Sequence, residues 1–432
     1  MPVILLVIFA LLAPTLSLAT PSISGVDGSI SNGALITITG LDFGVKSPAV
    51  PLFFDNFEGG SDGSYLHIID STNWTNRYDG AEYSSDTAYS GSLSAYNIVQ
   101  DGDQGTGEGF DSSFVTFSPT TEVYATYMFK HVGTDYTTGV EKQWRLTAYG
   151  SAYSGTGRVA FSDSYLFHNP GTGDVYLQTD DDGEPREFVS TEYGSSDWKR
   201  LQVHTAYSVP AGAANGYIYA TYGEEDKRYE GLVTRSTGET YEFTQLLLGL
   251  MQDEDSLGTG DIHQMYIDDV YIDNTQARVE LCDSDTWGNG SNCAPQPPVA
   301  WSNTGTDVTV NAAGYSDGDT AYLFVIDSSG AVSPAYTVVI GDTTTCYPDL
   351  DNDLYPGTGS ESVETCSTNY YEASHFTAMT TDCNDNNAAI NPGATDICGN
   401  GVIEDCVADV PCSSTAIRTG TTSTRAGSTV LR

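Results

Sequence analysis

The feature that most restricts the fold of this 432-residue chain is a regular alternation of apolar and polar residues in its central part. Segments 123–129, 198–207 and 216–222 each place apolar side chains at every second position. A period of two is typical of β-strands with one buried face, whereas a helix repeats every 3.6 residues. No segment shows a convincing amphipathic helix longer than three turns. We therefore predict an all-β fold.

The charge of the chain limits its partners. Its 58 acidic residues and 16 Lys and Arg residues give a formal net charge of -42. Nucleic acids and anionic membrane surfaces would be repelled, so we expect neither as a partner. Divalent cations suit such a chain. The 45 glycines and 28 tyrosines fit short strands joined by tight turns.

The first residues predict export. Residues 3–18 form an apolar run followed by small residues at positions 17 and 19, which predicts a signal peptide over residues 1–19. The alternative is a transmembrane anchor, but the run is short for a bilayer and contains Pro14. No later run could span a membrane, so we expect no span after signal removal and a secreted or cell-surface protein.

The eight cysteines all lie after residue 280. An even number of cysteines in an exported chain predicts disulfides. The alternative is a zinc site with Cys ligands, but the chain has no C-x-x-C pair.

Two strand-like segments frame the body of the chain. Segments 52–58 and 266–274 mix aromatic and β-branched residues with acids, and they resemble the first and last strands of a concanavalin-like or carbohydrate-binding jelly roll. The resemblance implies a jelly roll over residues 51–281 with these strands side by side. It also implies that Glu58 and either Asp268 or Asp269 share one Ca²⁺. The alternative is that these are surface acids at the rim.

Catalytic motifs are sparse in the jelly roll. The paired carboxylates of a retaining glucanase, spaced E-x-D-x-x-E, are missing. The triplet 202–204 resembles the Q-[IV]-H triplet of one alginate-lyase family. That resemblance implies catalytic candidates in Gln202 and His204 on one strand face and Arg145 on a neighbouring strand. The family's companion motifs are absent, and the alternative is an ordinary strand-face histidine, so activity stays uncertain and we lean against an enzyme.

Glycan binding requires fewer specifically placed side chains than catalysis does. It needs exposed aromatic rings that stack on sugars, with a few polar side chains beside them. The aromatic candidates sit on predicted central strands and could line a concave face, although most such residues belong to a core. They are Trp144, Tyr149, Tyr165, Phe167 and Trp198.

The segments that flank the jelly roll resemble two halves of one small domain. Residues 20–50 resemble the opening strands of an IPT/TIG domain, an immunoglobulin-like sandwich, and residues 297–341 resemble its closing strands. Half a sandwich cannot cover its own apolar face. We therefore predict a jelly roll inserted in a split Ig-like sandwich, with Cys282 and Cys293 closing a loop at the exit. The alternative is two unrelated β segments.

An acidic module follows the sandwiches. Residues 342–412 contain thirteen acids and no Lys or Arg. Asp349, Asp351 and Asp353 alternate on one short loop, so their carboxylates can converge on one cation. We expect the tail, residues 413–432, to be disordered.

The whole module resembles the MopE-type putative metal-binding motif, and through it thrombospondin type-3 calcium repeats. Leu354 replaces the usual glycine of that motif, which makes the loop harder to turn. Oxygen ligands favour Ca²⁺. Six cysteines allow fifteen pairings, among which Cys398 with Cys406 is the pair we favour. The resemblance implies ligands in Asp349, Asp351, Asp353, Tyr355, Asp382, Asp385, Asn387 and Asp396.

The alternative for this module is a disordered acidic linker stapled by disulfides. For the whole chain, three functions stay open. The first is a secreted or cell-surface calcium-binding protein that binds a polysaccharide or cell-surface glycan through its jelly roll. The second is a surface-layer or filament protein that self-assembles and is locked by calcium. The third is an extracellular polysaccharide lyase or glycoside hydrolase.

Overall fold

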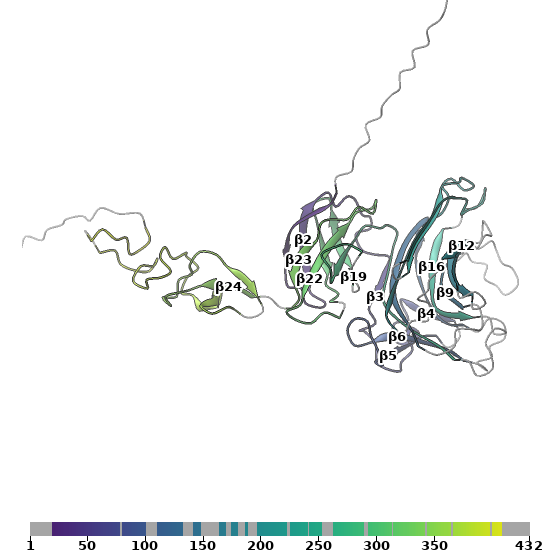
Figure 1. Ribbon diagram of the computed structural model, residues 1–432, viewed down its shortest axis with the longest axis horizontal. Coiled ribbons are helices and arrows are strands. Elements are labelled where there is room, and N and C mark those ends of the chain that lie inside the picture. Colours follow the sequence, from purple (N-terminus) through teal and green to yellow (C-terminus); the bar gives the residue numbers. More distant parts are fainter. Residues whose placement is uncertain are drawn as a thin grey trace, which may run out of the picture. The chain divides into compact units, whose positions relative to one another are not determined.

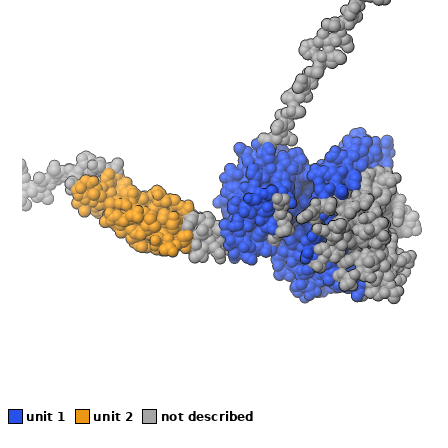
Figure 2. Space-filling view, viewed as in Figure 1, with its two compact units in different colours: residues 1–342 blue, residues 343–432 orange. Residues whose placement is uncertain are grey.

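The computed structural model divides into two compact units, residues 1–342 and 343–432 (Figure 2). None of the described residues forms a helix that is both long and apolar enough to cross a membrane. The described residues are 20–77, 80–100, 110–132, 141–147, 164–169, 174–179, 186–188, 197–222, 225–240, 242–252, 262–288, 293–312, 314–341, 344–363, 366–397 and 400–407. The predicted signal peptide and tail lie outside them.

The fold is nearly all β, as the alternation predicted (Figure 1). The longest α-helix in the described residues is one turn, α1 (Leu66–Ile69). The body of the first unit is a pair of antiparallel sheets, which we call the large sandwich. The first sheet has the order β15-β14-β13-β8-β17-β6-β5, with β3 also paired to β17. The second has the order β12-β11-β10-β9-β16-β7-β4.

The strands of the first sheet are β3 (Phe53–Asp55), β5 (Glu82–Ser84), β6 (Ser94–Gln100), β8 (Glu122–Val132), β13 (Lys199–Ala206), β14 (Gly216–Tyr222), β15 (Glu225–Leu232) and β17 (Ile262–Asp273). Those of the second sheet are β4 (Trp74–Arg77), β7 (Phe110–Thr120), β9 (Glu141–Thr147), β10 (Ser164–Asn169), β11 (Asp174–Thr179), β12 (Arg186–Phe188) and β16 (Phe243–Gln252).

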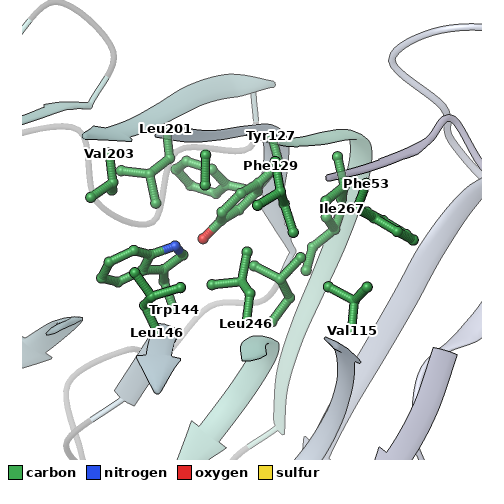
Figure 3. Packing of buried hydrophobic residues seen from close by; sticks show 14 of the residues in the cluster. Phe53, Val115, Tyr127, Phe129, Trp144, Leu146, Leu201, Val203, Leu246 and Ile267 are labelled. Atoms are coloured by element: carbon green, nitrogen blue, oxygen red, sulfur yellow. The ribbon is translucent and has the colours of Figure 1, made fainter. Parts of the chain in front are cut away.

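The two framing segments lie side by side, as predicted, because β3 pairs with β17 through Phe54 opposite Tyr271. The core of the large sandwich fills the space between its sheets (Figure 3). Trp144 of β9 points into this core and is 0% exposed. The prediction that Trp144 contacts a ligand is therefore wrong, because the alternation of β9 turns this ring inward with Leu146.

A second, smaller sandwich belongs to the same unit, and we call it the small sandwich. Its sheets have the orders β1-β2-β21-β20 and β19-β18-β22-β23. The strands are β1 (Ser22–Asp27), β2 (Leu35–Leu41), β18 (Arg278–Cys282), β19 (Cys293–Gln296), β20 (Pro298–Ser302), β21 (Gly305–Thr309), β22 (Thr320–Ile326) and β23 (Tyr336–Val339).

Strands from both sides of the large sandwich build the small one. Strand β2 pairs with β21, placing Ile36 opposite Val308. Both residues are buried in one apolar cluster, which covers the face that either half alone would expose. Strand β18 pairs with β22 in this sandwich, so its later part begins near residue 278 rather than at 297, and the disulfide of Cys282 with Cys293 joins β18 to β19.

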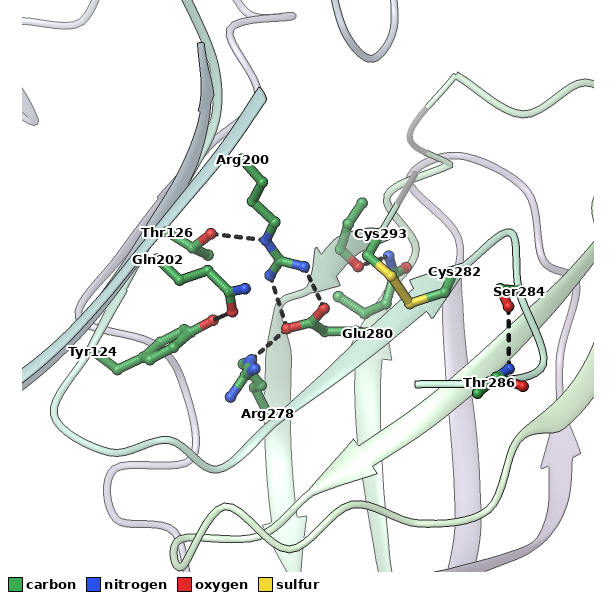
Figure 4. The surroundings of a disulfide bond; sticks show 12 residues. Tyr124, Thr126, Arg200, Gln202, Arg278, Glu280, Cys282, Ser284, Thr286 and Cys293 are labelled. Atoms are coloured by element: carbon green, nitrogen blue, oxygen red, sulfur yellow. Dashed lines mark hydrogen bonds and ion pairs between the residues drawn. A yellow bond between two sulfur atoms is a disulfide. The ribbon is translucent and has the colours of Figure 1, made fainter. Parts of the chain in front are cut away.

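Buried ion pairs join the two sandwiches of this unit. Arg200 of β13 donates from both terminal nitrogens to Glu280 of β18, at 2.6 and 2.8 Å, and Arg278 also pairs with Glu280 (Figure 4). Lys46 pairs with Asp273, and both side chains are 0% exposed. Partners on both sides of the contact neutralise these charges, so the small sandwich is fixed against the large one.

The second unit consists mainly of loops and is cross-linked by disulfides. Its sheet has the order β25-β24-β26. The elements are β24 (Thr344–Pro348), β25 (Glu361–Val363), β26 (Tyr370–Glu372) and the 3-10 helix η2 (Ala373–His375). Cys346 is bonded to Cys366, and Cys383 is bonded to Cys406. The favoured pair of Cys398 with Cys406 is therefore wrong, and Cys398 lies outside the described residues.

Candidate functional site

A cleft of about 560 Å³ lies between the outer face of the first sheet of the large sandwich and the small sandwich. The wall from the large sandwich is formed by strands β8, β13, β14 and β15. The opposite wall comes from β18, the loop after it, and the hairpin that joins β22 to β23.

Strand alternation decides which side chains reach this cleft. In β13, Leu201 and Val203 face the core, so Gln202 and His204 share the opposite face, as the sequence predicted, and that face lines the cleft. In β14, Ile218 lies in the core between the two tyrosines of the cleft, which are 217 and 219.

A hydrogen bond at each hydroxyl fixes the two tyrosine rings of the cleft. The Tyr217 hydroxyl lies 2.9 Å from His204 Nε2, and the Tyr219 hydroxyl donates to Glu230 Oε1 at 2.6 Å. The rings stack with centroids 4.7 Å apart and planes at 18°. His204 Nε2 also lies 2.8 Å from Glu122 Oε1.

The electrostatics of the cleft keep both phenols neutral. Burial, and then the carboxylate of Glu122, raises the pKa of the Tyr217 hydroxyl well above its usual value. Burial, and then its hydrogen bond to Glu230, raises the pKa of Tyr219 to about 12. Both groups therefore act near neutral pH as hydrogen-bonding hydroxyls rather than as phenolates.

The predicted constellation with Arg145 does not form. Strand β9, which carries Arg145, belongs to the second sheet, whereas Gln202 and His204 belong to the first. The Arg145 side chain lies outside the described residues. Among the described residues, the arginines that line the cleft are Arg228 and Arg278, and neither was predicted from the sequence.

Both arginines have partners already. The Arg228 Nε donates to Asp226 at 3.2 Å on the exposed rim. Arg278 pairs with Glu280 and lies 4.2 Å over the ring of Tyr124. Only sheet pairing brings these groups to the cleft, so strand assignment alone could not find them.

Trp198 is the other predicted aromatic contact whose side chain is described, and it does not line this cleft. The Trp198 ring is half-buried against Tyr89, with centroids 6.0 Å apart. Tyr149 and the Tyr165 side chain lie outside the described residues, as does that of Phe167. The missed aromatics were the tyrosines of β14, and the available signal was their i, i+2 spacing around a buried Ile.

The predicted calcium pair of the large sandwich lies on either side of the 89–93 loop. Glu58 Oε1 accepts from the backbone nitrogens of Ser92 and Leu93 at 2.7 and 2.8 Å. Asp269 Oδ1 accepts from Asn311 Nδ2 at 2.8 Å, while its buried Oδ2 has no hydrogen-bond partner in the structure. Burial raises the pKa of Asp269 to about 6.

Neither Glu58 nor Asp269 belongs to a group of three or more His, Cys, Asp or Glu ligands among the described residues. Most of their oxygens already accept hydrogen bonds from the protein. The pair therefore offers little free coordination, and the calcium role predicted for it stays a prediction.

The second unit gathers five carboxylates. One oxygen from each of Asp349, Asp351 and Asp385 lies within 4.8 Å of the others. The same holds for Asp351, Asp353 and Asp382, so Asp351 belongs to both groups. The alternate acids of the 349–353 loop thus point toward one another and toward acids from a later loop.

Several oxygens of this cluster are buried and have no hydrogen-bond partner among the residues that the structure describes. They are both oxygens of Asp351 and the Oδ2 atoms of Asp353 and Asp382. Desolvation, and then the neighbouring carboxylates, raises the pKa of Asp351. Unpaired negative oxygens that crowd together in this way fit the oxygen ligands that Ca²⁺ takes.

The other predicted ligands differ in position. Asp396 lies beside Glu404, whose nitrogen donates to it at 3.4 Å, and it belongs to neither carboxylate group. Asn387 Oδ1 accepts locally from the nitrogen of Ala389. Tyr355 directly follows the cluster loop, and its nitrogen donates to Asp353 Oδ1 at 2.9 Å.

Comparison with known proteins supplies no family. No family model matches the chain, so the IPT/TIG and MopE-type resemblances stay predictions. No curated protein matches it either.

Several solved structures are distantly similar to this chain. An endo-β-1,4-glucuronan lyase from the fungus Trichoderma reesei matches with a TM-score of 0.40 and 13% identity, over 52% of this chain and 96% of that one. Alginate lyase Aly36B matches with a TM-score of 0.38 and 13% identity, over 52% and 98% of the two chains. Alginate lyase vAL-1 from a Chlorella virus matches with a TM-score of 0.35 and 11% identity, over 48% of this chain and 96% of that one. Such distant likenesses carry no argument about activity, which has to come from the side chains.

Proposed function

We propose that this chain is an exported glycan-binding protein that binds a saccharide in the cleft of its first unit and Ca²⁺ in its second unit. The observation that carries the proposal is the pair of tyrosine rings on β14, fixed at both hydroxyls and exposed to a cleft lined by polar side chains.

The cleft has the chemistry that sugars need. Aromatic rings contact the apolar C–H faces of a pyranose, while amides and carboxylates bind its hydroxyls. Gln202 accepts a hydrogen bond from the Tyr124 hydroxyl at 2.8 Å through Oε1. Its amide nitrogen has no hydrogen-bond partner among the described residues, so it is available to donate to a ligand.

The calcium part of the proposal rests on the buried, unpaired oxygens of the carboxylate cluster. The residues that would hold the ion are Asp349, Asp351, Asp353, Asp382 and Asp385. A bound divalent cation would remove the repulsion among them and stabilise a unit that has few apolar residues to bury. Residues 342–412 contain no Lys or Arg that could neutralise the cluster. This absence favours an external cation.

Export is supported by the three disulfides of the described residues. Disulfides form and persist in oxidising compartments and are rare in the cytosol. Detection of the folded protein outside the producing cells, with residues 1–19 removed, would test this part.

Binding is tested by titrating a panel of oligosaccharides into the whole protein by calorimetry. Tyr219→Ala should weaken the tightest ligand about tenfold, the order expected for one aromatic contact. The control is Tyr65→Ala, because Tyr65 is a partly exposed ring outside the cleft. Equal affinities for the Tyr219 variant and the parent protein would rule out the cleft as the site.

A second candidate is a polysaccharide lyase, favoured by the contact of His204 with the Tyr217 hydroxyl. A lyase needs a base that removes a proton beside a sugar carboxylate. The raised pKa of Tyr217 keeps its hydroxyl protonated, so this residue is poorly suited to be that base. Absorbance at 235 nm that rises during incubation with polyuronates would place this function first.

A further inference from the structure

The opposite wall of the cleft belongs to a different sandwich from the tyrosine pair. Trp287 follows β18, and Ser328, Ser329 and Gly330 form the hairpin turn between β22 and β23. We propose that the small sandwich is half of the binding site and that the ligand is a neutral saccharide chain. This inference rests on the proposed glycan-binding function and adds the class of ligand and the element that selects it.

The charges of the cleft argue for a neutral ligand. A carboxylated or sulfated sugar needs a cation that is free to meet it, as Arg and Lys do at anion sites. The basic side chains that line the described cleft are His204, Arg228 and Arg278. Each has a carboxylate partner within the protein: Glu122, Asp226 and Glu280, respectively.

Arg278 is the least available of these groups. Its side chain is 4% exposed, its Nη1 donates to the carbonyl of Gln276 at 2.8 Å, and its guanidinium lies 5.8 Å over the Trp287 ring as well as over Tyr124. Figure 4 shows Glu280 between Arg278 and Arg200. Freeing Arg278 for a ligand would leave Glu280 buried and short of a partner, which is costly.

The net negative charge of the chain also favours a neutral ligand over an acidic one. The chain carries a formal charge of -42, so an anionic polymer approaches against long-range repulsion. A neutral saccharide meets no such barrier. It can use the free Gln202 amide and the Glu122 carboxylate, whose side chain is 38% exposed.

The wall from the small sandwich is preformed. Asp327 Oδ1 accepts from the Ser329 nitrogen and hydroxyl, at 2.8 and 2.7 Å, and from the Ala331 nitrogen at 2.9 Å. Gly330 has a positive φ of 83° and packs against Gln276, where even a Cβ atom would be crowded. A turn fixed in this way loses little entropy on binding, so it can set the width of the cleft.

Ser328 offers a way to test both walls. It is exposed, it lines the cleft, and it belongs to the small sandwich. Ser328→Trp should narrow the cleft and weaken a neutral ligand at least tenfold. Ser85→Trp is the matched control, since Ser85 is also exposed but lies outside the cleft. Ser328→Lys should add an unpaired cation and raise the ratio of acidic to neutral affinity roughly five- to tenfold.

The experiment is calorimetry of the whole protein and these variants with size-matched neutral, uronate and sulfated oligosaccharides. We expect the parent to prefer neutral ligands, the Ser328→Trp variant to lose them, and the Ser328→Lys variant to shift toward acidic ones. Unchanged thermal unfolding of each variant shows that the fold is kept.

Each contrary outcome would overturn a different part of the proposal. Preference of the parent for acidic ligands overturns the charge inference while leaving glycan binding standing. Neutral binding unaffected by Ser328→Trp overturns the role of the small sandwich. Binding of no saccharide at all removes the proposed function itself, and this inference with it.

Discussion

The two units of this protein bury acidic side chains in opposite ways. In the first unit, Glu280 is fully buried between Arg200 and Arg278, and Asp273 is buried against Lys46. In the second unit, the cluster acids face one another, and the one cationic candidate among the described residues near them is His375, 3.3 Å from Asp349.

The pKa values show the contrast. Burial alone would raise the pKa of Glu280, but the charges of Arg200 and Arg278 hold it at about 2. Desolvation and neighbouring carboxylates raise the pKa of Asp351 and of Asp382. At Glu280 the first unit thus neutralises a buried acid with its own arginines, whereas desolvation outweighs Lys46 and keeps the pKa of Asp273 raised. In the second unit, no Lys or Arg of the described residues neutralises the cluster acids.

The largest effect should come from breaking the network of the first unit. Glu280→Gln leaves two buried guanidinium groups without their carboxylate, so we expect unfolding free energy to fall by about 3–5 kcal/mol. All five tryptophans lie at or before residue 301, so their fluorescence in a urea titration reports this unit. Glu230→Gln, at an exposed site, is the control. A loss below about 1 kcal/mol would show that the network is not what holds the sandwiches together.

Acid should change the stability contributed by Glu280 and the stability contributed by the carboxylate cluster in opposite directions. The folded pKa of Glu280 lies below its usual value, so its stabilisation is full above about pH 4.5 and is lost as pH falls toward 2. A shift of this size corresponds to on the order of 3 kcal/mol. Without metal, the raised pKa values of Asp351 and Asp382 mean that the second unit gains stability as pH falls through them.

The acid experiment compares the parent with Glu280→Gln, because other acids also titrate. Asp269, for example, has a raised pKa of about 6 and favours folding as pH falls through that value. The difference in stability between parent and variant should shrink between pH 4.5 and 2. A constant difference would contradict the charge assignment of Glu280.

Calcium should stabilise the second unit and leave the first unchanged. At a free concentration of 100 times Kd, a ligand specific for the folded state adds about 2.7 kcal/mol. Trypsin finds no Lys or Arg in residues 342–412, so the assay uses chymotrypsin, with and without a chelator. Protection should disappear in Asp351→Asn and persist in Glu372→Gln, which alters an exposed acid outside the cluster. Equal cleavage rates with and without calcium would remove the metal role.

A smaller effect is expected at Leu354, which has a positive φ of 70°. Leucine is a poor replacement for glycine here, as predicted from the sequence, because the backbone does adopt the left-handed region. Leu354→Gly should relieve about 1 kcal/mol of strain in the cluster loop. We expect tighter calcium binding in a competition titration, whereas weaker binding would mean that the Leu354 side chain contributes packing.

The smallest effect should follow loss of the exposed pair of Arg228 with Asp226, whose side chains are 66% and 50% exposed. Solvent screens such pairs, so Arg228→Ala should change unfolding free energy by less than about 1 kcal/mol. The same fluorescence titration measures it. A larger loss would mean that exposed ion pairs stabilise this unit as much as its buried pairs do.

Much of the architecture could be predicted from the sequence because it depends on local patterns. The alternation in β13 placed Gln202 and His204 on one face. The acids of the 349–353 loop were predicted to converge on one cation; Asp351 does lie close to Asp349 and to Asp353, in two separate groups, and the cation stays a prediction. The errors arose where strand partners matter. Trp144 faces the core, and Arg145 belongs to the sheet opposite His204, because sheet order is set by contacts between distant segments.

By itself, the sequence determined which segments are strands, where acids are concentrated and which loop gathers them, because these depend on neighbours within a few residues. The tertiary structure decided which acids acquire partners. Arg200 meets Glu280 across 80 residues, and Lys46 meets Asp273 across 227. Such pairs, and the cleft between the sandwiches, exist only after packing has joined distant parts of the chain, since no local pattern encodes the distance between them.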